Sequence, residues 1–142
     1  MDYRYGSHTV FKVEYHFVWV TKYRYQILRG DVALRVRELV RQTCESFEIR
    51  ILSGVVSKDH VHILVSAPPT LAPSEIMRRI KGRTASKLFE EFPVLKKRYW
   101  GQHFWARGYF RVTVGQMTEE MIKQYLEHHF EAGTHKNFEI EP

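Results

Sequence analysis

The chain has 142 residues, 44% of them hydrophobic, which suits one compact domain with its own core. A single cysteine excludes an internal disulfide, and no apolar run approaches the roughly 18 residues that a membrane span needs. The net charge of +6 and the pI near 9.5 favour a polyanionic partner such as nucleic acid. We therefore expect one soluble, cytoplasmic domain over residues 1–142 that makes no contact with membranes.

The first half of the chain predicts two kinds of element. Val13–Val20 alternates between faces and predicts a strand. After a cap at Gly30-Asp31, apolar residues recur at helical spacing up to Phe47 and predict a helix. Two β-rich runs, 50–56 and 60–66, flank a short polar turn and predict an antiparallel hairpin.

The second half continues the pattern. A helix is predicted from Pro73 to about Phe92, where Pro93 stops it. An irregular, basic and aromatic segment (96–108) then leads to a predicted strand, 109–114. A last helix is predicted over 118–130, and the tail, about 133–142, is expected to be weakly ordered.

The order strand, helix, strand, strand, helix, strand is that of a ferredoxin-like fold. We therefore expect an α+β domain of the RRM-like type, with an antiparallel sheet and two helices on one face. The predicted C-terminal helix is an addition to that pattern. The opposite face of the sheet would then be free for a site.

A pair of histidines lies at the start of the second hairpin strand. Residues two apart on a strand share a face, so the imidazoles of His60 and His62 project side by side and make half of a metal site. On the last predicted helix, Tyr125 and His129 are one turn apart, so both side chains can contact the same small ligand. The plainer alternatives are two half-exposed histidines on a sheet face and a tyrosine packed in the core.

Cationic and aromatic side chains form a second candidate site, for DNA. Arg79, Arg83 and Lys87 recur every four residues along the second predicted helix, and such a stripe can neutralise phosphates. The candidate DNA-binding set adds residues beside the stripe and in two basic, aromatic stretches: Arg78, Lys81, Lys22, Arg24, Trp100 and Trp105, with Phe104 as a further base-stacking residue. The alternatives are solvated arginines and tryptophans that close a small core.

Several of these stretches, taken together, resemble one family. Asp59–Val65 resembles the histidine-hydrophobe-histidine motif of the HUH nucleases, and Ile122–His129 resembles the nucleophile helix of their smallest members. Those members are the single-tyrosine HUH transposases (TnpA) of the insertion sequence two hundred / six-oh-five family. Tyr15–Arg24, Ile80–Gly82 and Trp100–Trp105 are similar to the same family in the same order.

The resemblance implies a metal-dependent endonuclease and strand transferase that acts as a homodimer in a prokaryotic cytoplasm, at the nucleoid. Its substrate would be single-stranded DNA with hairpins near the ends of an insertion sequence. Tyr125 would attack a phosphate and form a 5′-phosphotyrosine intermediate, while His60, His62 and His129 would hold Mg²⁺ or Mn²⁺. The family pattern places glutamine where this chain has His129. A third nitrogen ligand makes the site softer and favours Mn²⁺ or Zn²⁺ over Mg²⁺.

Other functions remain open on the sequence. Within the same chemistry, the chain would suit a domesticated transposase associated with repetitive extragenic palindromes (REP), or another HUH nuclease. A metal-dependent hydrolase that uses water would cut DNA without becoming attached to it. From a different class, a non-catalytic RRM-like module would bind RNA, although the usual aromatic strand signature is missing.

Overall fold

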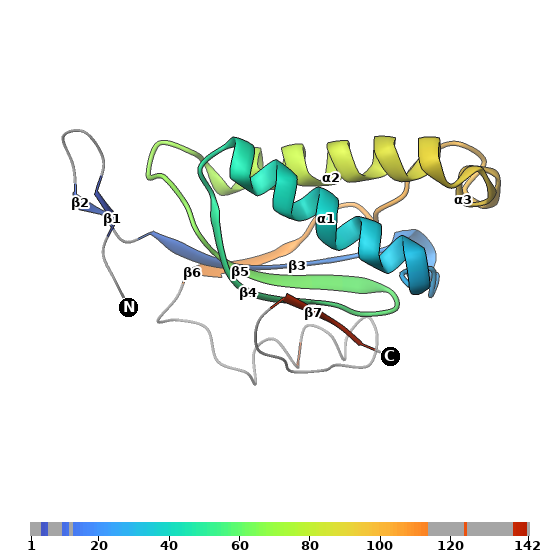
Figure 1. Cartoon of the computed structure of the whole chain (residues 1–142), viewed down its shortest axis with the longest axis horizontal. Coiled ribbons are helices and arrows are strands. Elements are labelled where there is room, and N and C mark those ends of the chain that lie inside the picture. Colours follow the sequence, from blue (N-terminus) through green and yellow to red (C-terminus); the bar gives the residue numbers. More distant parts are fainter. Residues whose placement is uncertain (1–3, 6–9, 12, 114–123, 125–137, 142) are drawn as a thin grey trace.

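A computed structural model describes residues 4–5, 10–11, 13–113, 124 and 138–141. Two long helices, α1 (Gly30–Ser46) and α2 (Pro73–Glu91), lie side by side on one face of a sheet (Figure 1). This is the α+β arrangement that the sequence predicts. In the described part of the chain, no helix is long and apolar enough to cross a membrane.

The main sheet has the strand order β6-β3-β5-β4-β7. Its strands are β3 (Glu14–Val20), β4 (Arg50–Val56), β5 (His60–Ser66), β6 (Phe110–Thr113) and β7 (Phe138–Ile140). The first four pair antiparallel, as predicted, and β5 lies between β3 and β4. Two short strands near the N-terminus, β1 (Arg4–Tyr5) and β2 (Val10–Phe11), form a separate ladder.

The core lies between the sheet and the two helices. Phe17 and Trp19 of β3 and Ile63 of β5 are fully buried there with Leu39 of α1 and Ile80 of α2. Because strand side chains alternate between faces, the residues between them point to the other face of the sheet. That other face carries His60 and His62.

Prolines set both ends of α2. Pro73 occupies its first turn, where a missing N–H costs no helical hydrogen bond, and the helix ends just before Phe92 and Pro93. A third, short helix, α3 (Pro93–Arg98), begins at that proline. The sequence prediction of an irregular segment from residue 96 is therefore wrong for its first three residues.

The C-terminal tail differs from the expectation. Phe138–Ile140 form β7, which pairs parallel to the edge strand β4, where the sequence predicts a weakly ordered tail. The strand is held because Phe138 and Ile140 pack against the core, and because Gly54 of β4 leaves room for the Phe138 ring. A Cβ at Gly54 would lie 2.9 Å from Phe138 Cδ1. The predicted helix over 118–130 lies outside the described residues except for Gln124.

Candidate active site and nucleic-acid surface

The two histidines of the predicted metal site lie on the sheet face opposite the helices. His60 pairs with Val20 of β3, and His62 pairs with Val18. Both imidazoles therefore project from the same face of β5, as the sequence predicts. His60 is almost completely buried, with 2% of its surface exposed, while His62 is half-buried.

The carboxylate of Asp59 fixes the ring of His60. His60 Nδ1 lies 3.0 Å from Asp59 Oδ1, and Arg24 Nε lies 4.0 Å from the other carboxylate oxygen. A carboxylate accepts but cannot donate, so the proton of a neutral His60 sits on Nδ1 and its lone pair on Nε2. A carboxylate behind an imidazole is the usual second contact of a metal-binding histidine.

A third histidine, His16 of β3, completes the described part of the site. Its Nδ1 lies 3.1 Å from His62 Nε2, and the two ring centroids are 5.3 Å apart. Burial lowers the pKa of His16, so this imidazole is neutral at neutral pH. His16 is not among the site residues that the sequence predicts. The sequence places His16 on the more polar face of the first predicted strand. Its closeness to His62 follows only from the register in which β3 pairs with β5.

The donor set fits a divalent metal as a partial site. Neutral imidazoles suit Mn²⁺ and Zn²⁺ better than Mg²⁺, and the pairing of His60 with Asp59 is typical of a ligand. Among the described residues, no group of three or more His, Cys, Asp or Glu side chains could hold a metal ion. The predicted nucleophile Tyr125 and third ligand His129 both lie outside the described residues.

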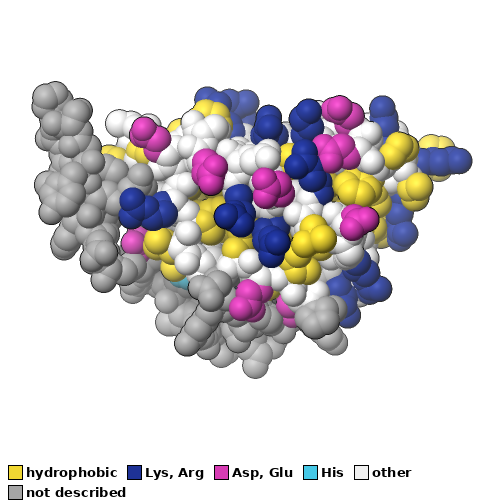
Figure 2. Space-filling model, viewed as in Figure 1, with side chains coloured by type: hydrophobic (Ala, Val, Ile, Leu, Met, Phe, Trp, Pro, Cys, Tyr) yellow, Lys and Arg dark blue, Asp and Glu magenta, His cyan; other side chains and the backbone are white. Residues whose placement is uncertain are grey.

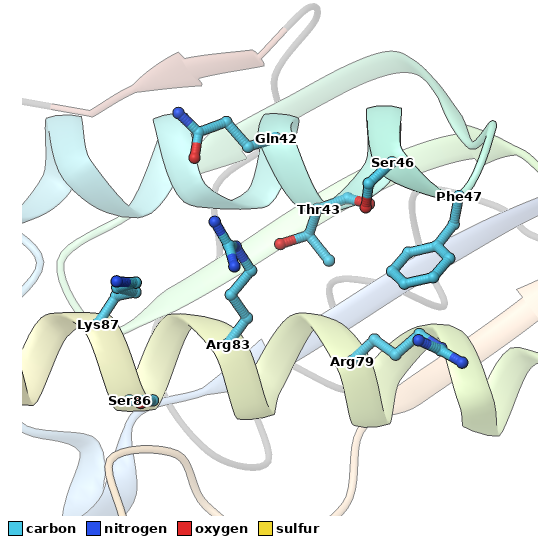
Figure 3. Close-up of a pocket in the computed structure, with 8 residues that line it drawn as sticks. All are labelled: Gln42, Thr43, Ser46, Phe47, Arg79, Arg83, Ser86 and Lys87. Atoms are coloured by element: carbon cyan, nitrogen blue, oxygen red, sulfur yellow. The ribbon is translucent and has the colours of Figure 1, made fainter.

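The cationic stripe of α2 lines a pocket of about 480 Å³ between α1 and α2. Figure 3 shows Arg83 reaching from α2 toward α1, with Arg79 beside Phe47. The Arg79 guanidinium lies 4.1 Å from the centroid of the Phe47 ring and donates to Glu75 at 2.8 Å. Lys87 Nζ lies 3.7 Å from a carboxylate oxygen of Glu90. Arg83 has no salt bridge among the described residues, and this leaves it the best placed of the three to meet a phosphate.

Two other members of the predicted DNA-binding set make contacts within the protein. Arg78 is exposed but donates to Glu75 through Nη2 at 2.6 Å. Lys81 is half-buried, and its Nζ donates to the carbonyls of Ala106 and Gly108 at 2.8 and 2.9 Å. Lys81 therefore ties α2 to the loop before β6, and burial lowers its pKa.

The aromatic residues of the set divide into buried and exposed. The prediction that Trp105 and Phe104 stack on bases is wrong, because they are only 5% and 1% exposed. The Trp105 ring packs edge-on against Trp19, and its Nε1 donates to Thr84 Oγ1 at 2.8 Å. Trp100, by contrast, is 89% exposed.

The remaining basic residues of the set, Lys22 and Arg24, lie in a short 3₁₀ turn, η1 (Lys22–Arg24), that follows β3. Lys22 lines two further hollows near Trp100, and Arg24 is exposed beside Asp59.

Comparison with known sequences shows the family of the chain, which the geometry of the site alone leaves open. Residues 9–129 match the profile of the family described as IS200-like transposases. The chain belongs to this family. The ISDra2 transposase TnpA of Deinococcus radiodurans is 34% identical over 122 residues, covering 86% of this chain and 87% of that protein. The transposase for insertion sequence element IS200 of Salmonella typhimurium is 37% identical over 125 residues, covering 88% and 82%.

Solved structures agree with the family. A Deinococcus radiodurans crystal structure assigned to a transposase superposes with a TM-score of 0.81 at 33% identity, over 91% of this chain and 99% of that one. A REP-associated tyrosine transposase bound to a REP hairpin superposes with a TM-score of 0.55 at 16% identity, over 90% and 68%. The second likeness shows the fold alone. As an IS200-like transposase, the chain is an enzyme of the DNA-cleaving kind.

Proposed function

We propose that this transposase cleaves and rejoins single-stranded DNA at insertion-sequence ends through a 5′-phosphotyrosine intermediate on Tyr125. A divalent ion, Mg²⁺ or Mn²⁺, would be held by His60, His62 and His129. The observation that carries the proposal is the His60–Asp59 pair beside His62 on one face of β5. Two imidazoles on one strand face, with a carboxylate behind one of them, support the proposal because they match part of the ligand set that such a metal centre needs.

The chemistry follows from the residue types. A tyrosine hydroxyl has a pKa near 10 and attacks a phosphodiester slowly at neutral pH. His60, His62 and His129 would hold a divalent ion against the scissile phosphate, and such an ion would supply charge that offsets the negative charge building on the phosphate oxygens. The Tyr125 hydroxyl loses its proton and Tyr125 Oη forms a bond to phosphorus as the bond from phosphorus to the 3′-oxygen breaks. That oxygen takes up a proton, so no proton is gained or lost overall. Because the phosphoester is conserved, a 3′-hydroxyl can reverse the step and join strands without ATP.

The α1–α2 pocket supports a duplex DNA partner for the same enzyme. Arg79, Arg83 and Lys87 are spaced one turn apart, so they can follow successive phosphates of a hairpin stem. The REP-associated relative in fold is bound to a hairpin, and hairpin DNA is the partner we propose here. Its 16% identity, against 34% and 37% to the insertion-sequence transposases, favours the mobile-element function over the domesticated one.

Adduct formation tests the chemistry. The protein is incubated with single-stranded DNA from the ends flanking its gene, with Mg²⁺ or Mn²⁺, and then denatured. Wild-type protein should give a denaturation-resistant adduct that Tyr125→Phe, His60→Ala and His62→Ala lack. Tyr109→Phe, which removes a hydroxyl elsewhere in the chain, should keep it. An adduct formed by Tyr125→Phe refutes the assignment, and cleavage with no adduct indicates a hydrolase that uses water.

Salt dependence tests the stripe. Each phosphate contact contributes about 0.9 to the slope of log K against log salt on duplex DNA. Arg79→Ala combined with Arg83→Ala should therefore flatten the slope for a hairpin by up to about 1.8. Arg29→Ala removes a charge just before α1, far from the pocket, and should leave the slope unchanged. An unchanged slope in the double variant refutes a role for the stripe.

The proposed enzyme is a homodimer, and mixing variants asks which protomer supplies the tyrosine. If Tyr125 serves the histidines of its partner, a mixture of Tyr125→Phe with His60→Ala/His62→Ala regains adduct, because one mixed site has both parts intact. If Tyr125 serves its own histidines, the mixture stays inactive. Light scattering of the wild-type protein checks the dimer directly, and a monomer at all concentrations refutes it.

A further inference from the structure

Two loops at one end of the molecule have a backbone that most side chains avoid. In η1, Tyr23 and Arg24 have φ angles of 61° and 56°. After α3, Trp100 and Gly101 have φ angles of 57° and 69°. A bulky residue with positive φ costs free energy, and such strain concentrates where a surface is held ready for a ligand. Three large side chains in this conformation in two adjoining loops therefore mark a candidate binding surface.

The strained turns present aromatic rings to solvent. Trp100 is 89% exposed and Tyr23 is 69% exposed. The Tyr23 ring stacks on Tyr99, with centroids 6.5 Å apart and planes at 19°, and Tyr99 is itself only 3% exposed. The Tyr99 hydroxyl donates to the Lys22 carbonyl at 3.2 Å, which links the two loops. The exposed rings thus rest on a buried aromatic support.

A hollow lies between these rings. It has a volume of about 140 Å³ and is lined by Lys22, Tyr23, Tyr99, Trp100, Gln102 and His103. A neighbouring hollow of about 390 Å³ shares Lys22, Gln102 and His103 and extends to Lys81 and Arg107. We call the two hollows together the aromatic groove. The rings among its lining residues can meet base faces.

The charge around the aromatic groove is positive. Lys22 and Arg107 line it, and Arg98 lies 4.0 Å above the Tyr25 ring next to it. No carboxylate is among the described residues that line either hollow. Figure 2 shows Lys and Arg side chains close to hydrophobic ones at the end of the molecule where α3 lies. A surface of exposed rings with cations suits single-stranded nucleic acid, whose bases stack and whose backbone is anionic.

We propose that the aromatic groove binds unpaired nucleotides of single-stranded DNA. A base stacks on Trp100 or Tyr23, and the adjoining phosphates meet Lys22 and Arg107. This inference rests on the proposed function, because it assigns the single-stranded part of that substrate to a place on the protein. Duplex DNA does not suit the groove, because paired bases already stack on their neighbours. The recognition is tolerant of sequence because every base has a π-face.

Tryptophan fluorescence reports on the groove directly. The chain has three tryptophans, and Trp19 and Trp105 are 0% and 5% exposed, so Trp100 alone is open to a soluble quencher. The Tyr125→Phe protein is titrated with oligothymidylate and with an abasic oligonucleotide of equal length and charge. Oligothymidylate should quench Trp100 and shield it from acrylamide, and the abasic strand should do so far less. Equal quenching by both strands, or none by oligothymidylate, overturns the proposal.

Affinity measurements with variants make the test quantitative. Trp100→Ala should weaken oligothymidylate binding about five-fold or more, as expected for the loss of one stacked base, and Trp100→Phe should keep most of the affinity. Val94→Ala is the matched control, because Val94 is 78% exposed on α3 but lines neither hollow. Equal affinity of Trp100→Ala and wild type overturns the groove. If Trp100→Ala binds as tightly as wild type but the wild-type protein still forms an adduct on its DNA ends, only the groove is refuted and the proposed function stands. The two failures are therefore distinguishable.

Discussion

Removing the carboxylate of Asp59 should weaken metal binding without disturbing the loop that carries it. The loop is held through the backbone, since the Asp59 carbonyl accepts from Thr21 N at 2.9 Å and from Thr21 Oγ1 at 3.3 Å. The side chain makes the 3.0 Å contact that orients His60. Loss of such a partner costs about 10- to 100-fold in metal affinity. Asp59 and His60 are 8% and 2% exposed, so water replaces the carboxylate poorly and the upper end of that range applies.

We therefore expect Asp59→Ala to bind Mn²⁺ about 100-fold more weakly than wild type, which corresponds to about 2.7 kcal/mol. Asp59→Asn keeps an acceptor oxygen and should lose about 10-fold. Titration calorimetry of the DNA-free protein with Mn²⁺ measures both. Lys58→Ala, an exposed neighbour in the same loop, is the control. Wild-type affinity in a folded Asp59→Ala variant would show that His60 needs no carboxylate, or that His60 is no ligand.

Three further predictions concern neighbouring contacts. His16→Phe keeps a ring but removes the nitrogen 3.1 Å from His62, so Mn²⁺ affinity should fall about 10-fold by calorimetry, and an unchanged value would make His16 a packing residue. Thr84→Val leaves the buried Trp105 N–H without its acceptor and should lower the free energy of unfolding in urea by about 1–3 kcal/mol. Thr84→Ser, which keeps the hydroxyl, should lose less. Burial raises the pKa of Cys44 to about 12, so Ellman's reagent should label it only after unfolding, and rapid labelling of the native protein would contradict its placement.

The long elements could be predicted from sequence because each repeats its pattern several times. Seven residues of alternation define β5, and 19 residues of helical spacing between two prolines define α2. The strand β7 is only three residues long and has no such repetition. Its existence depends on a distant glycine, Gly54, that lets Phe138 lie against β4. The sequence of the tail alone gives no indication of that contact, because Gly54 lies far away in the chain.

The aromatic residues show the same limit at the site. Trp100 and Trp105 lie five positions apart in one basic, aromatic segment, and the sequence assigns them the same role. Their surroundings separate them, because Trp105 finds a hydrogen-bond acceptor in Thr84 and a ring partner in Trp19, while Trp100 sits on a strained turn facing solvent. Likewise, His60 and His62 were recognisable from spacing within one strand, whereas His16 needed the pairing of two strands.

The helix α2 connects the two surfaces that we propose for DNA. Arg79 and Arg83 line the pocket against α1, whereas Lys81 and Gly82 line the aromatic groove on the other flank. Residues two apart on a helix differ by about 200°, so the sequence of α2 necessarily points alternate cationic positions to opposite sides. A hairpin stem on the α1 side and its unpaired extension on the η1 side would then be held at a spacing set by one rigid helix. In the proposed function, this arrangement makes the protein sensitive to the distance between a hairpin and the single-stranded segment beside it, without reading a base in either.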